Sequence, residues 1–216
     1  MKLFVWDFHG VLEKDNDLDV LYLSNIVLKN NGHTKQFSLS EANKLSGLKW
    51  YEYFEYLLPD LSHEEHLQLQ SDCLDYQRKN REAIHKYLKP NNHADYVLNK
   101  IKKAGHDQLL ISNTNLLDLV WFVKRVGLRD YFSDDRLIGI NSHQQKSNKN
   151  DAFRNFLKDN KKYEQIIIIG DSQKDIDLRL VNGGTTYYYM RPNRDHDIIE
   201  GADYKIDNLK EILKEI

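Results

Sequence analysis

Five short, largely apolar segments are spaced widely along the chain, one at its start and four from residue 108 onward. They are residues 3–6, 108–111, 137–140, 166–169 and 185–189. The fourth consists of four consecutive isoleucines. A segment that is apolar at every position suits a strand covered on both faces, as in a parallel sheet, rather than a half-exposed hairpin. The pattern therefore predicts the buried strands of a parallel sheet.

Amphipathic helical patterns lie between and after these strands, at residues 95–103, 116–126, 149–157 and 207–216. Val97, Leu98 and Ile101 share one face of the first helix, and Asp207 is the predicted N-cap of the last. Alternation of strands and helices from residue 95 to the end is typical of an α/β fold, with a Rossmann-like, doubly wound parallel sheet.

Residues 13–88 show helical patterns and no convincing strand. Helices are predicted at 18–29, 40–45, 50–58 and 62–87, and Ser62 with Glu65 has the pattern of a capping box. The expected organisation is a core made of residues 1–12 and 89–216. An all-helical domain, residues 13–88, is inserted into this core after the first strand.

Composition and charge exclude several classes of protein. The 216 residues are 40% hydrophobic and 30% charged, a balance that fits a globular protein rather than a disordered one. The formal net charge is -2, from 31 basic and 33 acidic residues. Without a basic excess, nothing favours nucleic acid or an anionic membrane surface as a partner.

Cysteine content and the opening residues predict a cytoplasmic location. Cys73 is the single cysteine, so no intramolecular disulfide can form, and we expect it to pack inside a helical pattern. The apolar opening is interrupted at Asp7, which makes it too short for a signal peptide or a membrane span.

Polar residues follow directly after three of the predicted strands. They are Asp7 after the first, Ser112 and Asn113 after the second, and Asp171 with Asp175 after the fourth. Functional groups of open α/β sheets gather at the carboxyl ends of the strands, so we expect these side chains to meet.

Each of these residues has an ordinary structural explanation, such as a helix cap for Asp171. Taken together, the residues also have a chemical explanation. Carboxylates crowd together only with a cation between them or with a shared proton. Mg2+ prefers octahedral oxygen ligands at about 2.0–2.1 Å, often one or two carboxylates with waters and a phosphate. A magnesium site beside an oxyanion pocket therefore accounts for the whole set.

Four segments, in this order, resemble the motifs of the haloacid dehalogenase superfamily. They are residues 7–12, 111–113, the region of Lys149, and 169–175. Residues 183–187 and 202–206 look like the closing strands of that family, and the insertion resembles the helical cap of its phosphoglycolate-phosphatase-like branch. The resemblance implies a Mg2+-dependent hydrolase, most simply a phosphatase, whose substrate is a small phosphorylated molecule.

The same resemblance implies a role for each motif. Asp7 is the nucleophile that forms an aspartyl-phosphate. Asp7, the backbone carbonyl of His9 and Asp171 hold Mg2+, and Asp175 is either a further ligand or a residue that supports the ligands.

The resemblance also implies that Ser112, the backbone N–H of Asn113 and a lysine bind the phosphate oxygens. Lys149, at the start of an amphipathic helix, is the expected lysine, and Lys146 is the alternative.

His9 departs from the family pattern, which has a second aspartate two residues after the nucleophile. That aspartate protonates the leaving oxygen and then activates water. Imidazole is a competent acid and base near neutral pH, but a divalent cation nearby disfavours imidazolium. We therefore expect either a phosphatase that uses His9 or an enzyme whose substrate or cap supplies the proton.

Residues 46–51 occupy the place where related caps present a specificity loop. Lys49 is a candidate for binding a remote anionic group and Trp50 for contacting a ring or sugar face. The alternative is that Trp50 belongs to the core of the cap and that Lys49 is solvated.

Other functions are compatible with the same motifs. One is a phosphate-binding or regulatory protein with little or no turnover, because of His9. Another is an enzyme of the family with a different reaction, such as C–P cleavage or phosphoryl transfer to an acceptor other than water. We expect a monomer or a homodimer, and the sequence does not name the substrate.

Overall fold

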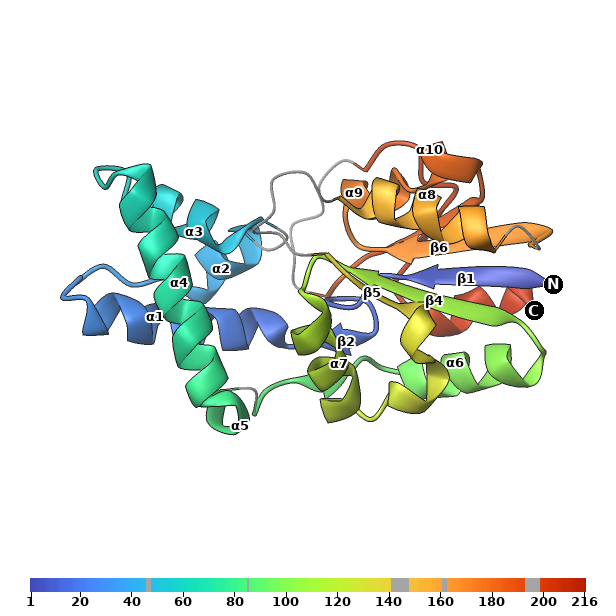
Figure 1. The fold of residues 1–216 in the computed structure, drawn as a ribbon, viewed down its shortest axis with the longest axis horizontal. Helices are drawn as coiled ribbons and strands as arrows, with labels where there is room; N and C mark the ends of the chain where they lie inside the picture. The colour runs from blue at the N-terminus through green and yellow to red at the C-terminus, as the bar shows by residue number, and fades with distance from the viewer. Residues whose placement is uncertain (46–47, 85, 141–147, 161–162, 193–198) are drawn as a thin grey trace. The chain divides into compact units, whose positions relative to one another are not determined.

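The computed structural model describes residues 1–45, 48–84, 86–140, 148–160, 163–192 and 199–216. The chain divides into two compact units. One consists of Met1–Lys14 with Lys89–Ile216, and the other is Asp15–Leu88 (Figure 1).

The first unit is built on a six-stranded, all-parallel sheet with the strand order β5-β4-β1-β6-β7-β8. The strands are β1 (Lys2–Trp6), β4 (Asp107–Ser112), β5 (Leu137–Gly139), β6 (Gln165–Gly170), β7 (Thr185–Tyr189) and β8 (Tyr204–Ile206). In the register, Val5 lies opposite Leu109 on one side and Ile168 on the other. The predicted doubly wound sheet is confirmed, with β1 at its centre.

The central strands do not alternate between apolar and polar residues, because both of their faces are buried. The four isoleucines of β6, residues 166–169, are between 0% and 4% exposed, as expected for a strand covered on both faces. Leu3 and Val5 pack in one cluster with Phe153.

Helices lie on both faces of this sheet (Figure 1). On one face are α8 (Lys149–Asp159), α9 (Gln173–Ile176) and α10 (Arg179–Asn182), and on the other are α6 (Ala94–Lys103) and α7 (Leu116–Arg125). Short 3-10 helices cover Arg129–Tyr131, Asp134–Arg136 and Leu209–Glu215. The expected apolar face of α6 is confirmed, since Val97, Leu98 and Ile101 are fully buried.

The prediction of a C-terminal α-helix capped by Asp207 is wrong. The segment Leu209–Glu215 is a 3-10 helix, and its N-cap is Asn208, whose side chain accepts from the Lys210 N–H. The buried residues Leu209 and Ile212 are three apart, the spacing at which side chains of a 3-10 helix share one side.

A two-stranded antiparallel ladder joins the segment that follows β1 to the segment in which the chain returns to the first unit. Here β2 (Glu13–Lys14) pairs antiparallel with β3 (Lys89–Pro90). No strand was predicted at these residues, because two-residue strands are too short to show a period. Residues 13 and 14 therefore fall in the same unit as the sheet, two residues beyond the expected boundary at residue 12.

The second unit contains helices only, among the residues that the structure describes. They are α1 (Asn16–Asn30), α2 (Leu39–Leu45), α3 (Trp50–Leu57), α4 (His63–Lys79) and α5 (Arg81–Ile84). Their shared core includes Leu23, Phe54, Leu69 and Cys73. The role of this unit as a cap stays a prediction.

The single long helix predicted at residues 62–87 is wrong in one respect. Its start is as expected, with Ser62 accepting from the Glu65 N–H in a capping box. The helix ends at Lys79, and its C-cap Asn80 donates both its backbone N–H and its side-chain amide to the Tyr76 carbonyl, each at 3.0 Å. A separate short helix, α5, follows.

None of the helices in the described part of the chain combines the length and the apolar character needed to cross a lipid bilayer.

The environment of Cys73 leads to a first prediction. Its side chain is fully buried, and burial raises the pKa of the thiol well above its ordinary value. We expect Cys73 to be unreactive toward a disulfide reagent such as DTNB in the folded protein and to react readily in 6 M urea. Rapid reaction without denaturant would show that the core of the second unit is open.

Candidate active site

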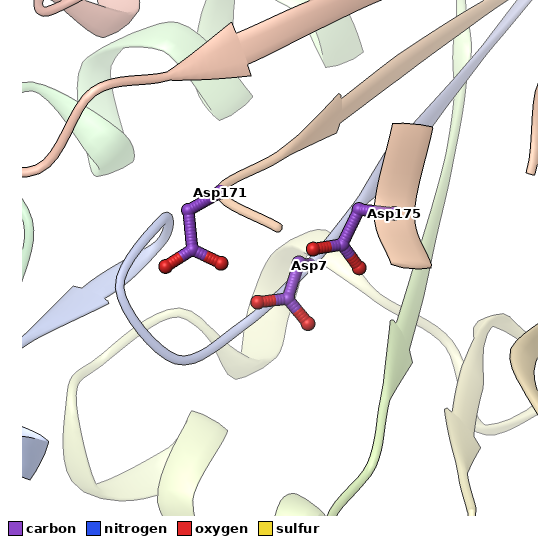
Figure 2. Close-up of side chains that lie close together, drawn as sticks. All are labelled: Asp7, Asp171 and Asp175. Atoms are coloured by element: carbon purple, nitrogen blue, oxygen red, sulfur yellow. The ribbon is translucent and has the colours of Figure 1, made fainter. Parts of the chain in front are cut away.

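The candidate site lies where neighbouring parallel strands end. Asp7 follows β1 directly and donates its N–H to the Ile169 carbonyl at 2.9 Å, while Asp171 follows β6. Asp175 is on the short helix α9, one turn after β6. Because β1 and β6 are adjacent and parallel, their carboxyl ends bring these three aspartates together (Figure 2).

The three carboxylates form one compact group. Oxygen atoms of Asp7, Asp171 and Asp175, one from each, lie within 4.8 Å of one another. Their side chains are 10%, 5% and 3% exposed. Three acidic groups this close and this dry repel one another unless positive charge lies beside them.

Two basic side chains supply such charge. Lys149, the first residue of α8, donates to Asp7 Oδ1 at 2.5 Å and to Asp175 Oδ1 at 2.6 Å. Arg191, just after β7, forms an ion pair with Asp171 through its Nε. Lys149 is 6% exposed, so its ammonium is removed from water and held by carboxylates.

The electrostatics are those of a buried, crowded site. Burial raises the pKa of Asp7 to about 7, with Asp175 and Asp171 acting in the same direction and Lys149 opposing them. Burial of Lys149 disfavours its charged form, but Asp175 and Asp7 outweigh it and raise the pKa of the ammonium above its ordinary value.

Asp175 is held in place from both sides. Its Oδ2 accepts from the Ser172 hydroxyl at 2.6 Å and the Ser172 N–H at 3.1 Å, and its Oδ1 accepts from Lys149. Gly170 permits this arrangement, because a Cβ at that position would collide with the Asp175 side chain. The end of β6 and the short helix α9 therefore approach each other closely at Gly170.

The loop after β4 approaches the same edge of the sheet. Ser112 is the last residue of β4 and is 2% exposed, while Asn113 is exposed. The Ser112 hydroxyl accepts from the Thr114 N–H at 3.3 Å. Thr114 also contacts His9, so the loop is linked to the segment that follows Asp7.

The structure brings together four of the residues expected from the sequence, namely Asp7, Asp171, Asp175 and Lys149. Lys146 lies outside the described residues, as do residues 46 and 47 of the expected specificity loop.

Lys49 and Trp50 belong to the helical unit. Lys49 is exposed at the start of α3, and Trp50 is partly buried against the core of that unit and donates through Nε1 to the Ser24 hydroxyl at 2.8 Å. Their roles in binding substrate stay predictions.

Two contacts were missed by sequence reasoning. Arg191 follows the end of β7, so the rule that located Asp7 and Asp171, that functional groups gather at the carboxyl ends of the strands, is the signal that could have located it. Glu13 lies beside His9 with its side chain fully buried. A single glutamate after two apolar residues gives no sign of burial in the sequence.

The donor set fits a hard divalent cation. All three acidic side chains offer oxygen, which is the ligand that Mg2+ prefers, and they sit in a cluster where two basic groups oppose three acidic ones. This edge of the sheet therefore presents carboxylate oxygens next to two basic side chains.

Comparisons with known proteins agree with this description. Residues 4–178 match the family model described as haloacid dehalogenase-like hydrolase. A comparison with curated proteins gives no match.

Several solved structures share the fold over nearly the whole chain. A predicted phosphoglycolate phosphatase from Haemophilus somnus 129PT is 18% identical with a TM-score of 0.83, covering 100% of this chain and 97% of that one. A haloacid dehalogenase-like family hydrolase from Streptococcus pneumoniae is 16% identical with a TM-score of 0.81, covering 99% and 97%. A predicted phosphatase from Clostridium acetobutylicum is 18% identical with a TM-score of 0.79, covering 99% and 97%. At these identities, the likeness shows the fold.

The raised pKa of Asp7 predicts a pH-dependent effect of Asp7→Asn on stability. The ordinary value is 3.8 and the folded value about 7, so the folded protein binds this proton more tightly and loses stability as pH rises through that range. Without divalent cations, the gain in the free energy of unfolding on Asp7→Asn substitution should therefore be larger at pH 8 than at pH 5. The expected difference between the two gains is about 1–3 kcal/mol.

Urea denaturation in EDTA at both pH values measures this difference. Titrating groups that do not interact with Asp7 are common to both proteins and cancel. Equal effects of the substitution at pH 5 and pH 8 would mean that Asp7 is already ionised throughout this range.

Proposed function

Because this chain belongs to the haloacid dehalogenase-like hydrolase family, we propose that it is a Mg2+-dependent phosphatase acting on a small phosphorylated molecule. The observation that carries the proposal is the position of Asp7, buried at the carboxyl end of the central strand and hydrogen-bonded to Lys149 beside two further carboxylates. Proteins of the same fold that are named as phosphatases support the choice of reaction.

The proposed reaction has two halves. In the first, a carboxylate oxygen of Asp7 attacks phosphorus, an acyl-phosphate bond forms, and the bond from phosphorus to the leaving oxygen breaks. The leaving oxygen takes a proton and departs as an alcohol. In the second, water attacks the phosphorus, which regenerates the Asp7 carboxylate and releases inorganic phosphate.

The proposed cation ligands are Asp7, the backbone carbonyl of His9 and Asp171. When bound, Mg2+ supplies positive charge that offsets the phosphate and favours the ionised form of Asp7. Both oxygens of Asp175 already accept hydrogen bonds, from Lys149 and from Ser172. This supports an indirect role, in which Asp175 holds Lys149 in position.

Ser112, the Asn113 N–H and Lys149 are the proposed phosphate-binding groups. Ser112 and Asn113 end and follow β4, next to β1, and Lys149 already contacts the nucleophile. The ammonium of Lys149 would therefore contact both Asp7 and the transferring phosphoryl group, where negative charge is greatest. Lys49 and Trp50 are proposed to contact the rest of the substrate.

His9 is proposed to act in place of the usual second aspartate. As imidazolium it gives a proton to the leaving oxygen, and as neutral imidazole it then takes a proton from the attacking water. Each catalytic cycle thus returns the residue to its starting form.

A screen of phosphorylated metabolites tests the proposal. We expect release of inorganic phosphate from at least one substrate, dependent on Mg2+, and a loss of at least about 1000-fold in Asp7→Asn because the nucleophile is gone. Asp177→Asn is a matched control, since Asp177 is bonded to Gln173 rather than to the cluster, and should keep wild-type activity.

Normal turnover by Asp7→Asn would rule out the aspartyl-phosphate mechanism. Binding of Mg2+ and a phosphate analogue without turnover of any substrate would instead support a phosphate-binding or regulatory protein.

A further inference from the structure

The His9 ring is held between two polar side chains and two aromatic rings. Its Nδ1 lies 2.6 Å from Glu13 Oε2, and its Nε2 lies 3.1 Å from the Thr114 hydroxyl oxygen. Phe8 and Phe122 contact the ring edge to face, with centroids 4.9 Å and 5.2 Å away. Both ring nitrogens are therefore paired, and packing sets the plane of the ring.

Glu13 lies on a segment that local hydrogen bonds hold in place. Its N–H donates to the Phe8 carbonyl at 3.1 Å, and its own carbonyl accepts from the Gly10 N–H at 2.9 Å. It also pairs with Pro90 in the β2–β3 ladder. Burial of a carboxylate is unfavourable unless it is hydrogen-bonded, and the His9 ring provides such a bond to a side chain that is 0% exposed.

The chemistry of the two partners determines which nitrogen carries the proton. In its ionised form the Glu13 carboxylate only accepts hydrogen bonds, so with Glu13 in that form Nδ1 donates to it. A hydroxyl both donates and accepts, so Thr114 can pair with Nε2 whether or not that nitrogen is protonated. The arrangement therefore places a proton on Nδ1, so that in the neutral ring Nε2 is the nitrogen with the lone pair, beside the Thr114 hydroxyl.

The contacts of Thr114 also show which part of the site Nε2 faces. Thr114 is in the loop after β4, and its N–H donates to the Ser112 hydroxyl at 3.3 Å. Nε2 therefore faces the loop that is proposed to bind the phosphate, whereas Nδ1 faces the buried Glu13.

We propose that Glu13 is a positioning residue for His9, which holds the proton on Nδ1 so that Nε2 is the nitrogen that exchanges a proton with substrate and water. The inference rests on the function proposed above. In the first half of the reaction a proton passes from Nε2 to the leaving oxygen, and in the second a proton passes from water to Nε2. The Nδ1 proton stays in place throughout.

The tautomer can be measured without any substrate. Nitrogen-15 NMR of the full-length, histidine-labelled protein at pH 8, with the His9 signals assigned by their absence in His9→Asn, reports whether Nδ1 is protonated. We expect a protonated Nδ1 in the wild type and in Glu13→Gln, whose amide oxygen still accepts, and an unprotonated Nδ1 in Glu13→Leu.

A kinetic measurement tests the consequence for catalysis. With a substrate of the wild type, Glu13→Leu should lower kcat by about 100-fold, the usual contribution of a general acid and base, while KM changes by less than about 3-fold. Glu13→Gln should recover most of the loss. Glu215→Gln is the matched control, because Glu215 is also paired, with Lys2 and Tyr187, but is outside the site.

The two arms separate failure of this inference from failure of the proposed phosphatase activity. An unprotonated Nδ1 in the wild type overturns the positioning role, whatever the activity, and this result does not depend on the folding of any Glu13 variant. A protonated Nδ1 in Glu13→Leu, or wild-type kcat in that variant, also overturns it. If no substrate is found, the spectra still decide the role of Glu13.

Discussion

The site depends on the repulsion between three carboxylates that share a small, dry volume at the edge of the sheet. Oxygens from Asp7, Asp171 and Asp175 lie within 4.8 Å of one another, at positions where water screens them little. Lys149 and Arg191 are placed where they reduce this repulsion. Binding of a cation would relieve this repulsion. The same repulsion therefore destabilises the fold without a cation and raises the affinity of the site for one.

Much of this arrangement could be read from the sequence because parallel sheets impose it. Apolar runs covered on both faces predicted the strands, and the rule that carboxyl ends of parallel strands meet predicted that Asp7, Asp171 and Asp175 converge. These features depend on local patterns and on topology, which a single sequence carries. Lys149 was expected from the resemblance to the family, with Lys146 as the alternative.

Other features depend on tertiary contacts that no local pattern records. The C-terminal 3-10 helix packs against α6, with Leu209 and Ile212 buried. The ladder between β2 and β3 joins residues far apart in the sequence. The pairing of Glu13 with His9 is of the same kind, and it gives a chemical context to the one position where the chain departs from the family motif.

Calorimetric titration of the wild type and of Asp171→Asn with Mg2+ tests most directly whether the aspartates form one metal site. The account predicts one Mg2+ per wild-type chain and binding at least about tenfold weaker in Asp171→Asn, because a ligand and its charge are removed. Asp177→Asn should bind like the wild type. Equal affinity of Asp171→Asn and the wild type would contradict the account.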